Sequence, residues 1–529
     1  MKNPEIFVVM VLYMCAVIGI GLYFYKRAQR NSESYFLGGR SLGPWVAAMS
    51  AEASDMSGWL LMGLPGVAYW CGLADAFWTA IGLAIGTYVN WLIVAKRLRN
   101  YSQLAGNSIT IPDFFSNRFK ENRKIVLGIS SVFILIFFTV YASSCFVTVG
   151  KLFNTLFDFD YHVTLIIGAL FVVAYTLIGG FLAESVSDFM QAIVMILALL
   201  AMIVVGVVNA GGFGAVVENS QNIDGFLSLG NLASPTVDKD GVQISEGGAP
   251  LFGAASNYGF LNIVSMLAWG LGYFGVPQVL LRFMAIRKAE EIKRSRIIAT
   301  AWCVISLAAA LLIGIIGRTL LPTHDALNTK SGAESILIVL STEYLPLIVA
   351  GLIMAGILAA TISSSDSYLL IASSSVSVNI FKGIIKKDKA TDKQVMWISR
   401  ITLVVIALIG VIIAWNENSV IFSLVSFAWA GFGATFGPLM LFSLFWKRTT
   451  RTGAIAGMLA GGVSVFVWKL VLAKFLADTI PFFGLYELLP AFIISSLAIV
   501  IGSLLSKEPS KETRDEFEAA KIGALDTEE

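Results

Sequence analysis

The stretch Ser50-Ala-Glu-Ala-Ser-Asp-Met-Ser-Gly-Trp59, followed by Gly63-Leu-Pro-Gly66, lies in a run that is otherwise apolar enough to cross a membrane. Glu52 and Asp55 are three residues apart, so they share one face of a helix. Carboxylates and helix breakers are tolerated in such a run where it faces the protein interior. If the helix unwinds here, its freed carbonyl oxygens can replace the water shell of a cation. The alternative is a kinked structural helix with a paired carboxylate.

The composition is that of a protein whose surface mostly faces lipid. Of the 529 residues, 57% are hydrophobic and 14% are charged. A soluble protein carries roughly a quarter charged residues. The net charge of +2 gives no reason to expect a nucleic-acid partner. Four cysteines without paired spacing, and two histidines in or beside polar connections, predict neither a disulfide framework nor a histidine-based metal site.

Hydropathy predicts an all-α integral membrane protein with about 13 transmembrane helices, in a single domain over residues 1–506. A spanning helix needs about 20 mostly apolar residues. The expected spans are 4–25, 44–70, 73–95, 125–150, 161–182, 184–209, 257–285, 292–320, 345–380, 397–415, 419–446, 451–473 and 485–506.

Basic residues alternate between successive connections along the chain. The connections predicted to be cytoplasmic hold Lys26, Arg27, Arg30, Arg40, Lys96, Arg97, Arg99, Arg118, Lys120, Arg123, Lys124, Arg282, Arg287, Lys288, Lys293, Arg294, Arg296, Lys382, Lys386, Lys387, Lys389, Lys393, Lys447, Arg448 and Arg451. The intervening connections hold only Lys151, Lys239, Arg318, Lys330 and Lys474. Because lysine and arginine favour the cytoplasmic side, this pattern predicts an N-terminus outside and a C-terminus in the cytoplasm.

Two segments lie outside the predicted spans and are polar. Residues 210–256 are predicted to form a long external loop. Residues 507–529 are charged and helix-prone, and we expect a solvated cytoplasmic tail. This tail is too short to form a signalling domain.

The ninth span contains a run of oxygen-bearing side chains, Ala359-Ala-Thr-Ile-Ser-Ser-Ser-Asp-Ser367. Ser363, Ser364 and Ser367 share one side of the helix, and Asp366 adjoins them. Hydroxyl and carboxylate oxygens are hard ligands that suit Na⁺ rather than soft metals. Serines that bond back to earlier carbonyls would explain one or two of them, but explain a run with an aspartate poorly.

Two further spans interrupt the apolar pattern. The sixth starts Glu184-Ser-Val-Ser-Asp188, and Asp188 is a third candidate acid, unless it merely stabilises a helix N-terminus. The seventh carries Trp269-Gly-Leu-Gly-Tyr273-Phe-Gly-Val-Pro277, in which glycines and a proline weaken the helix around two aromatic residues.

The second and seventh spans are thus both interrupted, lie five spans apart, and start on opposite sides of the membrane. Spans 2–6 and 7–11 would then be inverted copies in a five-plus-five core. Paired interruptions at corresponding positions indicate the binding site of an inverted-repeat transporter. The residues alone therefore predict a cation-coupled secondary transporter.

Four motifs resemble the sodium/solute symporter family, and the likeness runs from about residue 30 to 505. Within that family they are most like bacterial members that transport L-proline. The motifs are Leu37-Gly-Gly-Arg-Ser-Leu-Gly-Pro44, Ala53-Ser-Asp-Met-Ser-Gly-Trp-Leu-Leu-Met-Gly-Leu-Pro-Gly66, Trp269-Gly-Leu-Gly-Tyr-Phe-Gly275 and Ala428-Trp-Ala-Gly-Phe-Gly-Ala434.

The resemblance implies a LeuT-like core, with one helix before it and two after, in the bacterial plasma (inner) membrane. It also implies a Na⁺ site between the second and ninth spans. The ligands would be the carbonyl oxygens of Ala53, Met56 and Ala360 and the hydroxyls of Ser363 and Ser364.

Other positions are similar to family residues that couple ion and solute. Asp55 and Ser57 adjoin the predicted break. Asp188 resembles an aspartate that helps to hold a second Na⁺ in some relatives, here with Ser363, Asp366 and Ser367. The chain departs from the family pattern at Asp366 and at Glu184. These extra carboxylates would strengthen a second ion site or admit a proton.

For the solute, the resemblance implies a pocket lined by Trp59, Tyr141, Trp269, Tyr273 and Gln278, with Ser57 beside it. A proline zwitterion offers a carboxylate that favours half-helix N-termini and a compact ring that packs on aromatic faces. Aromatic residues that only pack or form an interfacial belt are the alternative.

The expected partners are therefore L-proline, Na⁺ and the lipid bilayer, with no obligate protein partner evident. A related symporter for another amino acid, sialic acid or pantothenate is the main alternative. A channel is disfavoured because no repeated filter sequence is present, and a membrane sensor because about 23 residues follow the last span. An enzyme is least favoured, since no nucleophile–histidine–acid set is visible.

Overall fold

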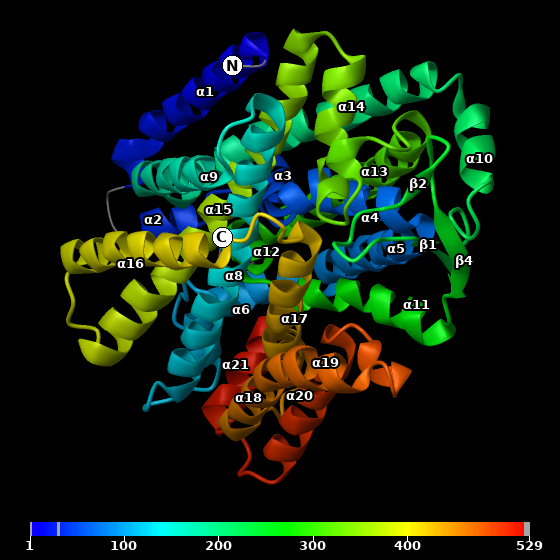
Figure 1. The fold of residues 1–529 in the computed structure, drawn as a ribbon. Helices are drawn as coiled ribbons and strands as arrows, with labels where there is room; N and C mark the ends of the chain where they lie inside the picture. The colour runs from blue at the N-terminus through cyan, green and yellow to red at the C-terminus, as the bar shows by residue number, and fades with distance from the viewer. Residues whose placement is uncertain (1–2, 29–31, 523–529) are drawn as a thin grey trace.

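The structure is a computed structural model that describes residues 3–28 and 32–522, and helices dominate it (Figure 1). Arg30 and residues 523–529 of the predicted tail lie outside the described residues. In the described ranges, eight helices are long and apolar enough to span a membrane: Leu73–Leu104, Ile125–Phe157, Gly180–Asn209, Ala289–Leu320, Leu347–Ile385, Asp392–Ile413, Ile421–Phe445 and Arg451–Leu476. A helix pair bent by 41°, Phe260–Phe274 with Pro277–Ala285, makes a ninth. Four shorter apolar helices are Pro4–Ile20, Trp59–Cys71, Tyr161–Leu177 and Leu488–Leu504.

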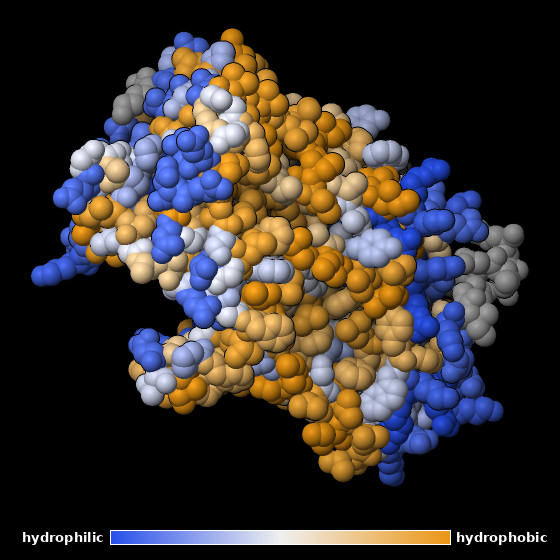
Figure 2. Space-filling model, turned by 90° about the vertical axis from the view of Figure 1, so that its right-hand side faces the viewer, coloured by the Kyte–Doolittle hydropathy of each residue, from blue (hydrophilic) through white to orange (hydrophobic). Residues whose placement is uncertain are grey.

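Each predicted span overlaps one of these helices or the bent pair. The shorter helices have fewer residues than a span normally needs, so the count of thirteen stays a prediction. Figure 2 shows a broad hydrophobic surface with hydrophilic residues gathered toward its edges, as expected for a chain embedded in lipid.

The predicted interruption of the second span is confirmed. Helix α3 (Pro44–Asp55) ends at Asp55, and Met56 leaves the helical region with φ −87° and ψ 76°. Helical structure resumes as η2 (Trp59–Gly63) and α4 (Leu64–Cys71). Glycine is needed at position 58, because a Cβ there would lie 2.4 Å from Oγ1 of Thr148 on a neighbouring helix.

The fifth and sixth predicted spans correspond to two apolar helices, Tyr161–Leu177 and Gly180–Asn209, which follow each other within α9 (Tyr161–Asn209) without a loop between them. The segment turns at Gly180, whose φ of 64° and ψ of 178° are not helical. Glycine adopts this positive φ without the steric cost that a Cβ brings. Asp188 therefore lies inside a helix, two turns beyond the kink, and not at a free helix N-terminus.

The predicted weakening of the seventh span is also confirmed. Helix α11 (Phe260–Leu267) tightens into the 3₁₀ segment η4 (Ala268–Phe274), and α12 (Pro277–Ala285) starts at a new angle. Gly275 lies at the bend, where a Cβ would be 2.3 Å from the carbonyl oxygen of Phe432. The two interrupted segments thus place their breaks deep in the protein.

The other helices surround these two. They are α1 (Pro4–Ala28), α2 (Ser32–Leu37), η1 (Gly38–Arg40), α5 (Leu73–Val89), η3 (Asn90–Val94), α6 (Ala95–Leu104), α7 (Ile111–Arg118), α8 (Ile125–Phe157), η5 (Ala289–Glu291), α13 (Ile292–Leu320), η6 (Asp325–Leu327), η7 (Gly332–Ser335), α14 (Ile336–Tyr344), α15 (Leu347–Ser374), η8 (Ser375–Ile385), α16 (Asp392–Ile413), α17 (Ile421–Phe445), α18 (Arg451–Val467), η9 (Trp468–Leu472), α19 (Ala473–Leu476), η10 (Pro481–Gly484), α20 (Leu488–Leu504) and α21 (Lys511–Ile522).

The polar connection over residues 210–256 is folded and anchored. It contains α10 (Phe213–Gln221) and the paired strands β1 (Asn231–Pro235) with β4 (Phe252–Asn257) and β2 (Ser245–Glu246) with β3 (Ala249–Pro250). The Leu73 N–H donates to the Phe226 carbonyl at 2.8 Å, and the Trp78 indole donates to the Leu229 carbonyl at 2.9 Å. These bonds fix the strands against the start of α5.

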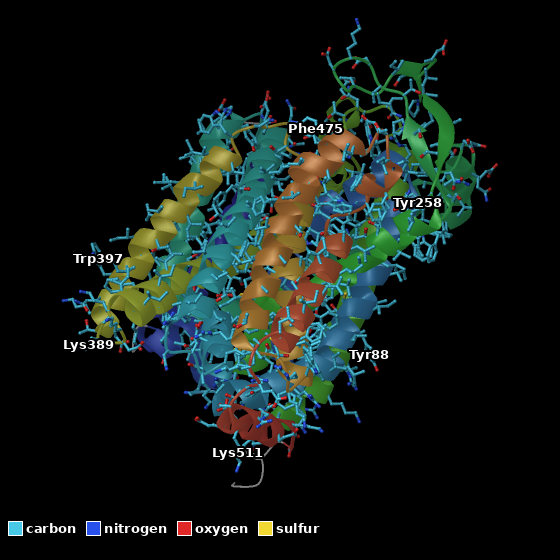
Figure 3. The ribbon with its side chains drawn as sticks, turned by 90° about the horizontal axis from the view of Figure 1, so that it is seen from below. Tyr88, Tyr258, Lys389, Trp397, Phe475 and Lys511 are labelled. Atoms are coloured by element: carbon cyan, nitrogen blue, oxygen red, sulfur yellow. The ribbon has the colours of Figure 1, made fainter. Side chains whose placement is uncertain are left out.

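The charged tail contains the expected helix, α21, but one face of it is buried. Phe517 is 6% exposed, its ring lies 6.4 Å from that of Tyr101, and the Arg118 guanidinium lies 5.3 Å from it. Lys120 forms ion pairs with Glu512 and Glu516. The prediction of a solvated tail is therefore wrong for this face of the helix, because Phe517 packs against residues of α6 and α7. Figure 3 places Lys511 and Lys389 at one end of the protein, and Tyr258 with the strands at the other.

Six of the described basic residues assigned to connections are buried, namely Arg40, Arg99, Arg118, Lys151, Arg282 and Arg318, and the partners of three of them show how such charges are accommodated. Arg282 is fully buried, Lys151 is 8% exposed and Arg318 is 3% exposed. Each has buried partners: Arg282 pairs with carboxylates, Lys151 with Glu334, and Arg318 donates to the Tyr69 carbonyl. Counting charge near helix ends cannot distinguish such paired side chains from solvated ones, and the side of the membrane on which each residue lies stays a prediction.

Lys151 and Glu334 form a buried clasp between α8, η7 and the N-terminus of α17. The Lys151 ammonium donates to the Glu334 carboxylate at 2.8 Å and to the Ser419 carbonyl at 2.7 Å. The same carboxylate accepts the N–H groups of Ile421 and Phe422, each at 2.9 Å. A carboxylate at a helix N-terminus also suits the helix dipole. The clasp joins three elements that are far apart in the sequence.

Candidate ion and solute site

The break after α3 meets the serine-rich face of α15. The Ser364 hydroxyl donates to the Ala53 carbonyl at 3.2 Å, and both residues are buried. Ala360 lies one turn before Ser364 on α15, and Met56 lies in the break itself. The structure therefore brings the second and ninth predicted spans together where the sequence places the first Na⁺ site.

The chemistry of this junction fits a Na⁺ ion. It offers backbone carbonyls from an unwound segment together with serine hydroxyls, which are the hard oxygen ligands that Na⁺ takes. The Ser363 hydroxyl is 1% exposed, yet it makes no hydrogen bond within 3.5 Å to any described residue. A buried polar atom without a partner costs about 1–3 kcal/mol. An ion held at this position would remove that cost.

Asp55 is the point where the two interrupted segments meet. Its Oδ2 accepts the hydroxyl of Tyr273 at 2.7 Å, and its carbonyl accepts the hydroxyl of Tyr141 at 3.2 Å. The Trp59 indole also donates to that carbonyl, at 3.3 Å. Asp55 is fully buried. Three other predicted site residues are therefore joined directly through Asp55.

Several polar atoms around Asp55 have no hydrogen-bond partner among the described residues within 3.5 Å. They include Oδ1 of Asp55, the hydroxyl of Ser57, and both Oε1 and Nε2 of the Gln278 amide. Gln278 lies close to Asp55 and is fully buried. Buried polar groups are normally satisfied, so these atoms have the capacity to bind a polar ligand or water.

Aromatic rings form one side of the junction. Trp59 and Trp269 have ring centroids 6.0 Å apart, and Tyr273 meets Trp429 edge-on at 5.1 Å. Tyr141 stacks on Tyr368 at 4.2 Å. The predicted aromatic residues thus belong to one packed cluster.

The sequence interpretation missed some members of this cluster. Trp269 also packs against Phe422 and Tyr486, both at 5.2 Å, and its carbonyl accepts the indole N–H of Trp429 at 2.8 Å. Trp429 lies in the motif Ala428-Trp-Ala-Gly-Phe-Gly-Ala434, so the sequence carried a signal for it. Phe422 and Tyr486 come from long-range packing that no local pattern reveals.

A second buried cluster lies at Asp188, and its central member is Arg282 of α12. The Arg282 guanidinium donates to Asp188 at 3.1 Å, to Ser367 at 2.9 Å and to Glu184. It also donates to the Ser50 hydroxyl at 3.0 Å, which in turn donates to Asp188 at 2.7 Å. All five residues are 1% exposed or less. Arg282 therefore links both interrupted segments to α9 and α15. The sequence interpretation placed this arginine in a connection.

The remaining predicted members of a second ion site are only partly brought together. Asp366 is fully buried, and neither of its carboxylate oxygens has a hydrogen bond within 3.5 Å among the residues described. It lies close to Thr176 and within electrostatic range of Glu184 and Asp188. Asp188 and Ser367 each already accept a hydrogen bond from the Arg282 guanidinium. Three carboxylates accordingly face one guanidinium.

Comparisons with known proteins identify the family of the chain. Residues 35–461 match the model of the sodium:solute symporter family. Sodium/proline symporters of Staphylococcus aureus strains USA300 / TCH1516 and JH9 are each 40% identical over 509 residues, covering 96% of this chain and 94% of each relative. With its interrupted helices and its oxygen-lined junction, the protein is a sodium-coupled solute symporter, and Na⁺ is its coupling ion. The chain belongs to the sodium:solute symporter family.

Solved structures give the same fold. A Na⁺-coupled sialic acid symporter in a substrate-bound outward-open state aligns with TM-score 0.76 and 19% identity, over 96% of this chain and 99% of that one. MhsT in complex with L-phenylalanine aligns with TM-score 0.51 and 13% identity, over 87% and 98%. The predicted LeuT-like helical fold is thereby confirmed, while the helix count and the repeat boundaries stay predictions.

Proposed function

We propose that the protein couples inward Na⁺ movement to the uptake of L-proline by alternating access. The observation that carries the proposal is the bond between Ser364 and the Ala53 carbonyl, beside the unpartnered hydroxyl of Ser363. This bond joins an unwound helix, which offers free carbonyl oxygens, to a helix that offers serine hydroxyls. Such oxygens are the ligands that Na⁺ takes. The 40% identical relatives named sodium/proline symporter support the choice of solute.

In this proposal, Na⁺ is held by the carbonyl oxygens of Ala53, Met56 and Ala360 and by the hydroxyls of Ser363 and Ser364. Asp55 lies next to this set and supplies a negative charge to the same junction. A monovalent ion is favoured because the ligands are mainly neutral oxygens. Na⁺ binding would draw the α3 break and α15 together and so complete the solute site.

The solute would lie at the break between α3 and η2, against the aromatic cluster. The ring of proline is suited to the faces of Trp59 and Trp269, because apolar rings pack favourably on aromatic faces. Its carboxylate would lie near the half-helix N-terminus that follows Ser57, where backbone N–H groups favour an anion. Its ammonium group would take acceptors from the unpartnered oxygens of Asp55 and Gln278.

The driving force is the Na⁺ gradient. Inward movement of one charge releases about 2.3 kcal/mol per 100 mV, to which the concentration gradient adds. Because about 1.4 kcal/mol corresponds to a tenfold ratio, one co-transported ion sustains roughly a hundredfold solute gradient.

We also propose one Na⁺ per solute. A second Na⁺ at Asp188, Asp366 and Ser367 would have to displace the Arg282 guanidinium, which already donates to Asp188 and Ser367. Arg282 thus supplies the positive charge that a second ion would bring. The ratio of charge moved to proline taken up in proteoliposomes tests this: one charge per proline is expected, and two would contradict it.

The proposed architecture has thirteen spans with an inverted repeat over spans 2–6 and 7–11, an external N-terminus and a cytoplasmic C-terminus. The end of the protein that holds Lys389 and Lys511 in Figure 3 would then face the cytoplasm, and the end with the strands would face outward. Labelling single cysteines introduced at Lys239 and Lys389 with an impermeant reagent in intact cells would decide the orientation. Reaction at 239 but not at 389 is expected.

The central test is uptake of labelled L-proline into proteoliposomes with and without an inward Na⁺ gradient. Accumulation that saturates and requires the gradient is expected. The alternative is a symporter of the same family for another small solute. Competition by an excess of other amino acids, sialic acid or pantothenate would reveal it, and a lack of Na⁺-driven proline accumulation would refute the proposed solute.

A further inference from the structure

A polar cavity of about 440 Å³ lies at the end of the protein that holds Lys511 (Figure 3). Its walls come from the connection between α7 and α8, the first residues of α18, and the segment that joins α20 to α21. The hydroxyl-bearing residues of the wall are Thr449, Thr450, Thr452, Ser506, Ser510 and Thr513. None of them belongs to the candidate ion and solute site, so the cavity needs an explanation of its own.

Two cations in this cavity have no counter-charge. The side chains of Arg451 and Lys507 are exposed, and neither forms a hydrogen bond or ion pair with any residue that the structure describes. The two acids of the wall are already engaged. Glu121 accepts two backbone N–H groups, each at 3.0 Å, and Glu508 pairs with Arg514 at 3.1 Å. The cavity therefore offers unneutralised positive charge beside hydroxyl donors, which is the chemistry that binds a phosphate group.

Exposed apolar residues begin directly beside the cavity. Leu504 and Leu505 precede Ser506 of the wall, and Leu505 is 84% exposed. Ile501, one turn earlier on α20, is also exposed, as is Leu459 on α18, the helix that packs against α20 (Figure 1). In a chain that spans a membrane, such residues face lipid acyl chains. A molecule that carries both a phosphate and apolar chains can therefore occupy the cavity and this surface together.

The tail forms one wall of the cavity and is held there by its own bonds. The Arg448 guanidinium donates to the Ser506 carbonyl at 2.8 Å, and the hydroxyls of Ser506 and Thr450 bond each other at 2.7 Å. On the far side of the tail, Lys120 pairs with Glu512 at 3.2 Å. A group bound in the cavity would thus contact a membrane helix, α18, and the segment that leads into α21.

We propose that this cavity binds the headgroup of an anionic phospholipid. Arg451 and Lys507 pair with the phosphate, the Thr452 hydroxyl donates to one of its oxygens, and the acyl chains lie along the exposed end of α20. Basic clusters beside spanning helices recognise anionic lipids in this way. Free phosphate shares the charged part of this chemistry, but it has no use for Leu504 and Leu505. Because the lipid contacts both α18 and the tail, it strengthens the docking of α21. The inference does not depend on which solute the protein carries.

Binding of a fluorescent phosphatidylglycerol to the purified full-length protein in detergent tests the site. Combining Arg451→Gln with Lys507→Gln should weaken this binding about tenfold or more, because the two charges that attract the phosphate are removed. Lys389→Gln with Lys393→Gln is the matched control. It removes the same charge from exposed residues at the same end of the protein that do not line the cavity, and it should bind as the wild type does. Without lipid, both double variants should unfold at the wild-type temperature, since all four side chains are exposed.

Competitors identify the ligand. Unlabelled phosphatidylglycerol should displace the probe, whereas phosphatidylcholine, which has no net charge, and inorganic phosphate, which has no acyl chain, should displace it poorly. Displacement by millimolar inorganic phosphate would show that the cavity takes the free ion, and it would overturn the lipid assignment. The site is also refuted if the Arg451 and Lys507 double variant binds the probe as tightly as the wild type, or if the control variant loses as much binding.

Hydrogen exchange of residues 511–522 gives a readout of the link to the tail. Phosphatidylglycerol should slow this exchange in the wild type and in the control variant, but not in the variant that lacks Arg451 and Lys507. Equal exchange rates in the wild type with and without phosphatidylglycerol would contradict the proposal that the lipid strengthens the docking of α21.

Discussion

The hydroxyl of Tyr273 donates to Oδ2 of Asp55 at 2.7 Å, and this bond joins the two interrupted segments of the protein. Tyr273 belongs to the tightened part of the seventh predicted span, and Asp55 is the last helical residue of α3. Both side chains are buried. We therefore expect an event that changes the charge environment of Asp55, such as the proposed binding of Na⁺, to affect the other segment directly.

Tyr273→Phe should lower the apparent affinity for Na⁺ about tenfold. The substitution keeps the ring and its contact with Trp429, but removes a hydrogen bond to a carboxylate, which is worth about 1.5–3 kcal/mol. Na⁺-dependent uptake of proline across a range of Na⁺ concentrations measures the effect. Tyr344→Phe is a control, because the Tyr344 hydroxyl bonds the Leu320 carbonyl away from the junction. Equal Na⁺ dependence in wild type and Tyr273→Phe would contradict the coupling role of this bond.

Ser364→Ala should weaken apparent Na⁺ affinity about tenfold or more, because it removes a proposed ligand and its bond to the Ala53 carbonyl. Asp55→Asn should do the same by removing the charge beside the ion. Ser365→Ala is the matched control on the same helix, since the Ser365 hydroxyl bonds back to the Thr361 carbonyl at 2.6 Å. Its Na⁺ dependence should match the wild type. If both Ser364→Ala and Asp55→Asn left the Na⁺ affinity unchanged, the site assignment would fail.

Arg282→Met should destabilise the protein by about 3–5 kcal/mol, because it leaves the buried carboxylates of Glu184 and Asp188 without their cation. Thermal unfolding of the purified protein in detergent measures the loss. Adding Asp188→Asn and Glu184→Gln to Arg282→Met should recover part of it, since the unpaired charges are then gone. The exposed Arg287, which pairs with Glu291, is a control whose replacement by alanine should have a small effect. Comparable effects at the two arginines would show that the buried cluster is not the cause.

Gly66→Ala should destabilise the protein by about 1–3 kcal/mol through overpacking. A Cβ at position 66 would lie 2.7 Å from the Cα of Glu334, so α4 could no longer rest on the clasp. Gly214→Ala is a suitable control, because a Cβ there meets no heavy atom within 4 Å. Unfolding temperatures of the two variants would be compared with the wild type, and a Gly66→Ala variant of wild-type stability would argue against this close packing.

Phe517→Ala should release α21 from its docking surface. The pKa of Lys120 is raised above its ordinary value of 10.5, mainly by its hydrogen bond to Glu516. Because the pKa is raised, the ion pair of Lys120 with Glu516 stabilises the docked helix fully below pH 10.5. This stabilisation is lost as the pH rises past the shifted pKa. Docking should therefore persist at neutral pH. Hydrogen exchange of residues 511–522 at pH 7 should be protected in the wild type and fast in Phe517→Ala, whereas Phe475→Ala should leave the protection of this helix unchanged.

The sequence predicted the features that local chemistry controls. Met56 and Gly275 lie where the helices break, because proline, glycine and small residues make these positions poor helix formers. The resemblance paired Ser364 with the interrupted second span, and its hydroxyl does lie against the Ala53 carbonyl, while its role as a Na⁺ ligand stays a prediction. The contact with Ala53 then follows from the way α15 packs against α3.

The sequence could not predict features that depend on long-range partners. Arg282 lies near a helix end, where a basic residue normally indicates a cytoplasmic connection, and its burial is explained only by the carboxylates that α9 brings to it. Phe517 is hidden among charged residues, and its burial depends on Tyr101 and Arg118. Phe422 similarly becomes part of the candidate site only through its contact with Trp269.

The clasp of Lys151 and Glu334 has a mechanical consequence. It cross-links α8, η7 and the first turn of α17 through short charged bonds in a region that excludes water. Separating these elements would leave two buried ions unpaired, so we expect them to move together, as one frame, during a transport cycle. We expect the half-helices that pack against this frame to move relative to it: α4, which contacts Glu334 at Gly66, and η4, whose Trp269 contacts Phe422. Transport would then involve movement of the half-helices against a fixed frame, and not a symmetric movement of two equal halves.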